Sequence, residues 1–236
     1  MSPDLDFATG RAVASSERIF LREVFAWMFA ALALSTGIAV WFHADHTFSQ
    51  SYLQTHSGLF FVAIFAQLGL VIALQWSINR ISATTAALLF FVYAALTGAV
   101  FSVILTEFTS GTVVGAFAGA GGVFGGMALW GYTTERDLSG WGGILFGALI
   151  GIVVASMVFL FVGGTTFNLI LGWGGVIIFS GLTAFQMQML KRQAQAGFGG
   201  NSAVAEKAAI LGALRLYLSF VNLFISLLRI FGGTGR

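Results

Sequence analysis

Long apolar stretches, separated by short polar segments, occupy almost the whole chain. The hydrocarbon core of a bilayer is about 30 Å thick, and a helix rises about 1.5 Å per residue, so about 20 apolar residues cross it. The pattern therefore predicts an all-α integral membrane protein with about seven transmembrane helices. The predicted spans are 22–42, 58–78, 84–106, 109–130, 142–163, 166–190 and 208–231.

These spans predict a chain in three parts: a cytoplasmic N-terminal segment over 1–21, a seven-helix transmembrane domain over 22–231 and a short external tail over 232–236. The first segment is polar with interspersed charges, which is not the pattern of a cleavable signal peptide. Between the sixth and seventh spans, Gln188 to Glu206 is predicted to form a long polar connection.

The positions of Lys and Arg predict the orientation, because cytoplasmic loops carry an excess of these residues. The loops 43–57, 107–110 and 163–165 contain no Lys or Arg. The basic residues between or before the spans fall on the opposite side: Arg11, Arg18, Arg22, Arg80, Arg136, Lys191, Arg192 and Lys207. We therefore expect a cytoplasmic N-terminus and an external C-terminus, and a bacterial inner membrane as the location.

Composition excludes several classes of function. Hydrophobic residues make up 58% of the chain and charged residues 8%, against about 25% charged in a typical soluble domain. The net charge of +2 is not clustered, so we expect no nucleic-acid partner. Cysteine is absent, and all three histidines lie in the segment 43–57, away from the spans. We expect no cofactor, no metal site and no enzymatic activity.

Glycines spaced by four residues recur in the fourth and fifth spans. Residues four apart share one helix face, so such runs form flat grooves that allow another helix to approach closely. We predict helix packing at these positions, with a hinge or a pore lining as the alternative. They are Gly115, Gly119, Gly122, Gly126, Gly143, Gly147 and Gly151.

Polar residues form one stripe along the last span. They are Arg215, Ser219, Asn222, Ser226 and Arg229, and they share a single helix face. Polar groups that face lipid are costly, so the stripe is expected to face other helices or a water-filled cavity.

Several polar residues of the spans are candidates for ion pairs or for a gate. Arg215 is expected either to anchor the helix near the membrane surface or to act in gating. Glu23 is its expected partner, and Glu107 is the expected partner of Arg229. Gln67, Thr183 and Gln186 are further buried candidates, and the glutamines are expected to form hydrogen bonds between helices.

Three segments resemble the transmembrane Bax-inhibitor-motif family. They are Gly131–Ser139 (GYTTERDLS), Phe179–Gln186 (FSGLTAFQ) and Leu216–Gly232, and the resemblance covers roughly 15–236. It implies a seven-helix fold in which the last helix is enclosed by the other six. It also implies a pH-sensitive calcium leak and a link to stress or cell-death control.

The chain departs from that family at the residues implied to form the gate. The resemblance implies a pair of aspartates at the positions of Gln186 and Ser219, and often an acid near the position of Gln67. Two close carboxylates share a proton and form a pH switch, which neutral side chains cannot do. Calcium conduction or pH gating is therefore expected to be weakened.

Two functions follow as alternatives. The first is an ion leak that does not titrate through a carboxylate pair. The second is a non-conducting regulator or scaffold that binds other membrane proteins, such as a quality-control protease. The expected partners are the lipid bilayer, calcium or other ions, and other membrane proteins.

Overall fold

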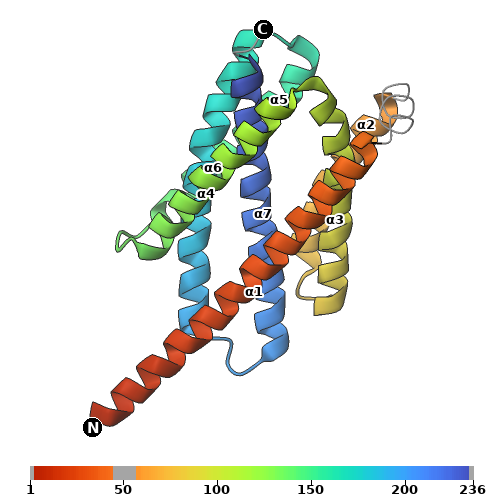
Figure 1. Cartoon of the computed structure of the whole chain (residues 1–236). Helices are drawn as coiled ribbons and strands as arrows, with labels where there is room; N and C mark the ends of the chain where they lie inside the picture. The colour runs from red at the N-terminus through yellow and green to blue at the C-terminus, as the bar shows by residue number, and fades with distance from the viewer. Residues whose placement is uncertain (1–2, 45–56, 234–236) are drawn as a thin grey trace. The chain divides into compact units, whose positions relative to one another are not determined.

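The computed structural model describes residues 3–44 and 57–233, with the side chains of 15–44, 58, 62–159 and 161–233. His46, His56 and the last residues of the predicted tail, 234–236, lie outside them. The described chain is helical (Figure 1). Its helices are α1 (Pro3–Ala44), α2 (Ser57–Ser77), α3 (Ala83–Ile104), α4 (Ser110–Thr133), α5 (Gly142–Val162), α6 (Thr165–Ala196) and α7 (Ser202–Gly233), with short 3-10 turns η2 (Leu105–Glu107) and η3 (Ser139–Trp141).

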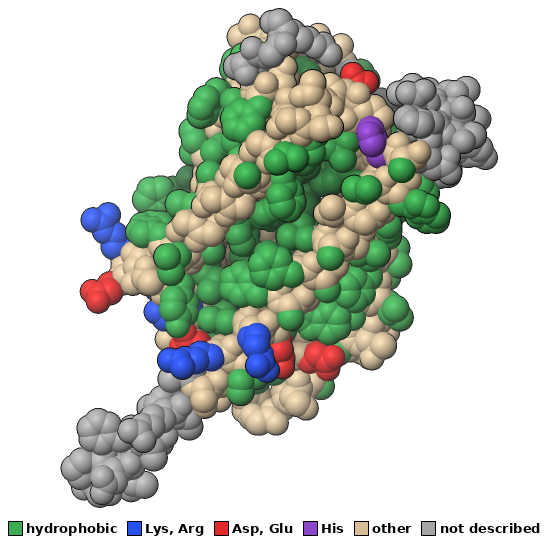
Figure 2. Space-filling model, in the orientation of Figure 1, with side chains coloured by type: hydrophobic (Ala, Val, Ile, Leu, Met, Phe, Trp, Pro, Cys, Tyr) green, Lys and Arg blue, Asp and Glu red, His purple; other side chains and the backbone are tan. Residues whose placement is uncertain are grey.

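The predicted membrane fold is confirmed. Among the described residues, six helices are long and apolar enough to cross a membrane, namely all except α2. The apolar part of α2 with described side chains, Val62–Ser77, is shorter. Hydrophobic side chains dominate the face drawn in Figure 2, and few charged side chains appear on it.

Local sequence explains where the central helices begin and end. The hydroxyl of Ser82 accepts a hydrogen bond from the Thr85 backbone nitrogen (3.1 Å) and starts α3. Thr109 starts α4 in the same way, through the Thr112 backbone nitrogen (3.3 Å). Gly163 and Gly164 separate α5 from α6 with φ of 64° and 100°, which side chains rarely tolerate.

Three helices are longer than their predicted spans. The segment 188–206 is not a long connection, because α6 continues to Ala196 and α7 begins at Ser202. Its Gln, Lys and Arg residues make it too polar to be predicted as membrane-spanning. These residues and its alanines nevertheless have high helix propensity. The helix α1 likewise begins at Pro3, well before residue 22, and proline suits the first helical position. The division of the chain into cytoplasmic, transmembrane and external parts stays a prediction.

The chain forms two compact units. The first comprises Met1–Glu107 and Gln193–Tyr217, and the second comprises Phe108–Arg192 and Leu218–Arg236. In the first unit, α3 packs against both α1 and α2. The helix α7 contributes its first part to one unit and its second part to the other.

Tyr217 is the centre of the first unit, where its side chain is fully buried. Its ring meets the rings of Phe90 and Tyr93 on α3 edge-on, at centroid distances of 5.6 and 5.9 Å. Its hydroxyl lies 2.6 Å from the hydroxyl of Ser35 on α1. The Ser35 hydroxyl also lies within hydrogen-bond distance of the carbonyls of Ala31 and Ala94 (2.9 and 2.8 Å). This cluster joins α1, α3 and α7.

In the second unit, α7 packs against α4 and α6. The ring of Phe220 meets those of Phe117 and Phe124 on α4 edge-on, at 5.4 and 5.6 Å. On α6, a Cβ added to Gly172 would lie 2.8 Å from Cγ1 of Ile230. The absence of a side chain at Gly172 therefore allows α6 and α7 to approach closely.

The last helix is the most enclosed, as predicted. Of the six candidate spans, α7 has the largest share of its apolar window buried, 67%. Its described side chains contact α1 and α3 in the first unit, and α4, α5 and α6 in the second.

The glycines of the predicted grooves lie in two different environments. Gly115 and Gly119 do face α7: a Cβ at Gly119 would lie 3.2 Å from Leu227 Cδ1. A Cβ would meet no atom within 4 Å at the other predicted positions, so their assignment to packing is corrected: Gly122, Gly126, Gly143, Gly147 and Gly151. A four-residue spacing identifies a face but not whether a neighbour covers it.

We predict that Gly131→Ala lowers the stability of the protein, whereas Gly122→Ala does not. Gly131 is buried on α4, and an added Cβ would lie 2.7 Å from Cα of Ala184, a backbone atom that cannot move aside. Overpacking of this kind costs about 1–3 kcal/mol. Gly122 lies on the same helix in open space and serves as the matched control. Thermal unfolding in detergent measures both, and equal melting temperatures would contradict the packing described.

Candidate functional site

Gln186 and Ser219 are brought together at the centre of the candidate site. Ser219 lies on α7 and is buried, and its hydroxyl donates to Oε1 of Gln186 on α6 at 2.9 Å. Neither side chain carries a charge at any physiological pH. The positions that the family resemblance implies to hold a titrating pair therefore hold a neutral hydrogen bond.

Other polar residues near this pair bond to their own helices. Asn222 donates to the carbonyl of Leu218 (2.8 Å), and Ser226 donates to that of Asn222 (2.6 Å). On α6, the fully buried Thr183 donates to the carbonyl of Phe179 (2.7 Å). Such bonds to the carbonyl four residues earlier satisfy a polar group without needing a neighbouring helix.

The polar stripe of α7 is not uniformly buried. Ser219 and Ser226 are buried, whereas Arg215, Asn222 and Arg229 are only partly buried. The latter three recur every seven residues, which is two helical turns, so they lie along one line of the helix. Within the stripe, these three residues are thus more accessible than the two serines.

Arg229 has a mixed environment in the second unit. Its Nη1 lies 3.5 Å from the Ser156 hydroxyl on α5, a long hydrogen bond, and its guanidinium lies 5.9 Å from the ring centre of Phe159. A cation over an aromatic face is stabilised by the ring quadrupole. Glu107 belongs to the first unit, and its pairing with Arg229 stays a prediction.

The expected ion pair between Glu23 and Arg215 is not formed. Among the described side chains, one pair of opposite charges lies within 4 Å, and it joins Arg192 to Asp137 (2.7 Å). Glu23 is exposed on α1. Gln67 on α2 also lacks the expected hydrogen bond: its buried Nε2 has no partner among the described residues.

A second polar cluster, not predicted as a site, fixes the connection between α4 and α5. Gln188 on α6 is buried, and it accepts a hydrogen bond from the Leu138 backbone nitrogen (2.8 Å) and donates to the Arg136 carbonyl (2.7 Å). One turn further along, Lys191 donates to the Tyr132 carbonyl (2.8 Å) and lies 4.8 Å from the ring centre of the same residue.

This cluster explains how the segment GYTTERDLS, residues 131–139, is held in its conformation. The last turns of α6 hold its backbone at three points, and Arg192 adds the ion pair with Asp137 and a hydrogen bond to Ser139 (2.5 Å). The sequence already singles out this segment, because it is one of the three that resemble the Bax-inhibitor-motif family. Its partners were missed because residues 188–206 were assigned to a connection.

Asp137 is the exposed acid of this cluster. A hydrogen bond from the Ser139 backbone nitrogen (2.9 Å), a second from its side chain and the contact with Arg192 lower the pKa of Asp137 to about 2. All three favour the carboxylate over the acid. This group therefore stays ionised near neutral pH and is no switch there.

Comparison with known proteins identifies the family. A family model described as inhibitor of apoptosis-promoting Bax1 matches residues 17–236. The chain belongs to the Bax inhibitor-1 family. Inner membrane protein YbhL of Escherichia coli is 41% identical over 213 residues, which are 90% of this chain and 91% of YbhL.

Two further relatives are similar to the chain over different lengths. An uncharacterised protein of Deinococcus radiodurans is 40% identical over 90% of each chain. An uncharacterised membrane protein of Streptococcus pyogenes is 47% identical over 63% of this chain and 64% of its own length. The resemblance stated from the sequence is thus confirmed over almost the whole chain.

We predict opposite effects for the same substitution at two glutamines. Gln188→Leu removes both hydrogen bonds to the 136–138 backbone and is expected to lower the free energy of unfolding by about 1–3 kcal/mol. Gln67→Leu removes a buried amide whose nitrogen has no partner, so it is expected to be neutral or stabilising. Thermal unfolding of both variants tests this contrast, and a larger loss for Gln67→Leu would refute it.

The lowered pKa of Asp137 predicts how stability depends on pH. A carboxylate whose pKa is lower in the folded state stabilises above its unfolded pKa, and that stabilisation is lost as pH falls from about 4 to about 2. Asp137→Asn is therefore expected to have a lower melting temperature than the wild type near neutral pH. The difference between the two melting temperatures is expected to disappear on acidification. A difference in melting temperature that instead varied between about pH 6 and about pH 8 would contradict the lowered pKa of Asp137.

Proposed function

We propose that this Bax inhibitor-1 family protein acts in ion or membrane-stress homeostasis as a leak pathway without a carboxylate gate. The supporting observation is the hydrogen bond between Ser219 and Gln186 at 2.9 Å. A serine and a glutamine have no proton to exchange near neutral pH, whereas two close carboxylates would share one. The contact between α6 and α7 at this point is therefore independent of pH.

The charges along α7 also argue for weak calcium conduction. Calcium prefers six to eight oxygen ligands, with carboxylates among them. Of the acids with described side chains, Glu17 alone is buried, and it lies near the start of the apolar part of α1. A cation that moved along the stripe of α7 would instead meet Arg215 and Arg229. Its passage is disfavoured by charge repulsion in a medium of low polarity.

A second candidate function is a non-conducting regulator or scaffold that binds other membrane proteins. The observation that favours it is the set of exposed small residues on the outside of α4 and α5. Nothing within 4 Å covers them, and small residues allow a second transmembrane helix to approach closely. They are Gly122 and Gly126 on α4, and Gly143, Gly147 and Gly151 on α5.

The proposed location is a bacterial inner membrane with the N-terminus in the cytoplasm. The distribution of Lys and Arg supports this orientation, because three loops on the opposite side contain neither residue. The similarity to a protein named inner membrane protein YbhL supports the location.

Calcium flux across liposomes tests the leak proposal. The purified protein is reconstituted, and flux is measured at about pH 6 and about pH 8; for the wild type we expect a weak flux that changes by less than about twofold. The double variant Gln186→Asp with Ser219→Asp is expected to gain a leak that depends on pH. Gln186→Asn with Ser219→Thr keeps both groups neutral and is the matched control.

The outcomes separate the alternatives. A wild-type leak with strong pH dependence would show that another group is the sensor and would overturn the proposal. No wild-type flux, together with a membrane protein that co-purifies from the cell and is lost on substitution of Gly143 and Gly147 by Leu, would favour the regulator instead.

A further inference from the structure

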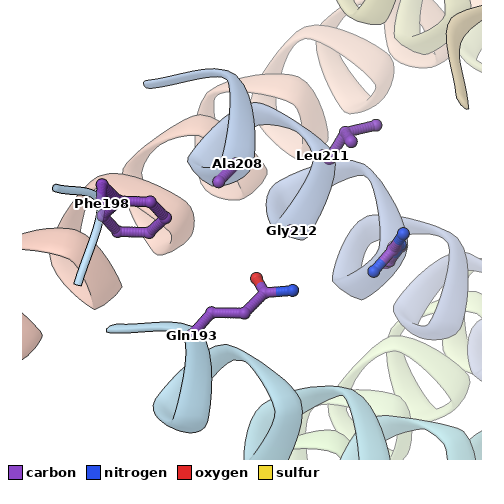
Figure 3. A pocket seen from close by; sticks show the side chains of 6 residues that line it. Gln193, Phe198, Ala208, Leu211 and Gly212 are labelled. Carbon is purple, nitrogen blue, oxygen red and sulfur yellow. The ribbon is translucent and has the colours of Figure 1, made fainter. Parts of the chain in front are cut away.

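A cavity of about 270 Å³ lies in the first unit, between the end of α6 and the first half of α7. It is smaller than the pockets of about 300–1,000 Å³ that enclose drug-sized ligands, but it has room for a small ion and several waters. Figure 3 shows the amide of Gln193 projecting into the space bordered by Phe198, Ala208 and Gly212. The remaining lining residues are Leu211 and Arg215.

The wall of this cavity is held in place by the turn between α6 and α7. Gly197, Gly199 and Gly200 have φ of 72°, 60° and 75°, and glycine adopts such values without strain. Between them, the ring of Phe198 packs on Phe20 of α1 with a centroid distance of 5.0 Å. Because Phe20 is buried, Phe198 is anchored rather than free to fill the cavity.

The polar side chains of the lining are those of Arg215 and Gln193. Arg215 is partly buried, and its guanidinium makes no hydrogen bond or ion pair with any described residue. Gln193 has an amide group that is also unpaired within the described chain. The arginine has only hydrogen-bond donors, and the glutamine amide has two donors beside its acceptor oxygen, so both residues that line this space can donate to an anion.

No carboxylate neutralises this charge within the described part of the unit. Glu17 on α1 is buried, but it accepts a hydrogen bond from Nε2 of Gln195 (3.0 Å) and lies more than 4 Å from any cationic group with a described side chain. Glu23 and Glu206 are exposed to solvent. A partly buried arginine without a counter-ion is unfavourable, and a bound anion would remove that penalty.

We propose that this cavity binds a phosphate group, either free in solution or as the headgroup of an anionic lipid. A guanidinium fork matches two phosphate oxygens with paired hydrogen bonds, and the Gln193 amide donates to a third. Lys207, partly buried beside Ala208 on α7, adds a positive charge at the same end of the helix. On the proposed orientation this end faces the cytoplasm, where anionic headgroups attract basic pockets between helices.

This site does not depend on whether the protein conducts ions. Its first test uses the full chain in nanodiscs and compares Arg215→Gln with Arg22→Gln, which removes the same charge from an exposed position on α1. One arm titrates inorganic phosphate in phosphatidylcholine nanodiscs by calorimetry. The other counts phosphatidylglycerol molecules retained after extraction from mixed nanodiscs, by native mass spectrometry.

We expect the wild type to bind in at least one arm, and Arg215→Gln to weaken that binding by about tenfold or more. Arg22→Gln is expected to change it by less than about twofold, because an exposed charge adds little. Binding in the first arm identifies a free anion, and binding in the second arm alone identifies a lipid headgroup. An equal loss in both variants, or no binding in either arm, would overturn the proposal.

A second test needs no substitution and so does not depend on the folding of a variant. Phenylglyoxal modifies accessible arginines, and peptide mass spectrometry reports the rate at each position. Phosphate or phosphatidylglycerol is expected to slow modification of Arg215 several-fold and to leave Arg22 unchanged. Equal rates at Arg215 with and without both anions would count against the site even if Arg215→Gln failed to fold.

Discussion

Hydrocarbon offers no hydrogen-bond partner, so every polar side chain on a membrane-spanning helix must be satisfied inside the protein or by water. On α7 this constraint determines the arrangement of its neighbours. The hydroxyl of Tyr217 is hydrogen-bonded to that of Ser35 on α1, and Ser219 donates to Gln186 on α6. Glycines lie where two helices approach closely. Gly98 on α3 lies beside the carbonyl of Ser35 on α1, and Gly175 on α6 lies beside Ser226 on α7. The small residues thus allow the helices to come close enough for these polar contacts to form.

The same helix carries two arginines that have no carboxylate partner among the described residues. Arg215 and Arg229 are fourteen residues apart, about 21 Å along α7. Between them, α7 meets other helices through neutral polar side chains among the described residues: Tyr217 bonds to Ser35 on α1, and Ser219 bonds to Gln186 on α6. The potential along this face is therefore positive, which disfavours cations and favours anions. The proposed weak calcium leak and the proposed phosphate site near Arg215 both rest on this distribution of charge.

Much of the fold follows from the sequence, because span length and apolarity are properties of the chain itself. The ends of α6 and α7 do not, since Lys191, Arg192 and their neighbours are polar but favour helix, and hydropathy does not register helix propensity. Spacing identified the glycine faces of α4 and α5 but not which face is covered; Gly131, which contacts α6, belongs to no repeat. In the site, the resemblance singles out Gln186 and Ser219, and the structure joins them. The resemblance gave no indication of Gln188, whose partners are backbone atoms about fifty residues away in the sequence.

If the contact between α6 and α7 does not titrate, the distance between these helices is the same at all pH values near neutrality. The chain has no cysteine, so spin labels can be placed at Ile177→Cys on α6 and Ile225→Cys on α7 without a background. Pulsed electron resonance then measures their separation at about pH 6 and about pH 8. We expect the same distance distribution at both pH values, and a shift only when Gln186 and Ser219 are both replaced by Asp. A shift in the presence of the native pair would contradict this expectation.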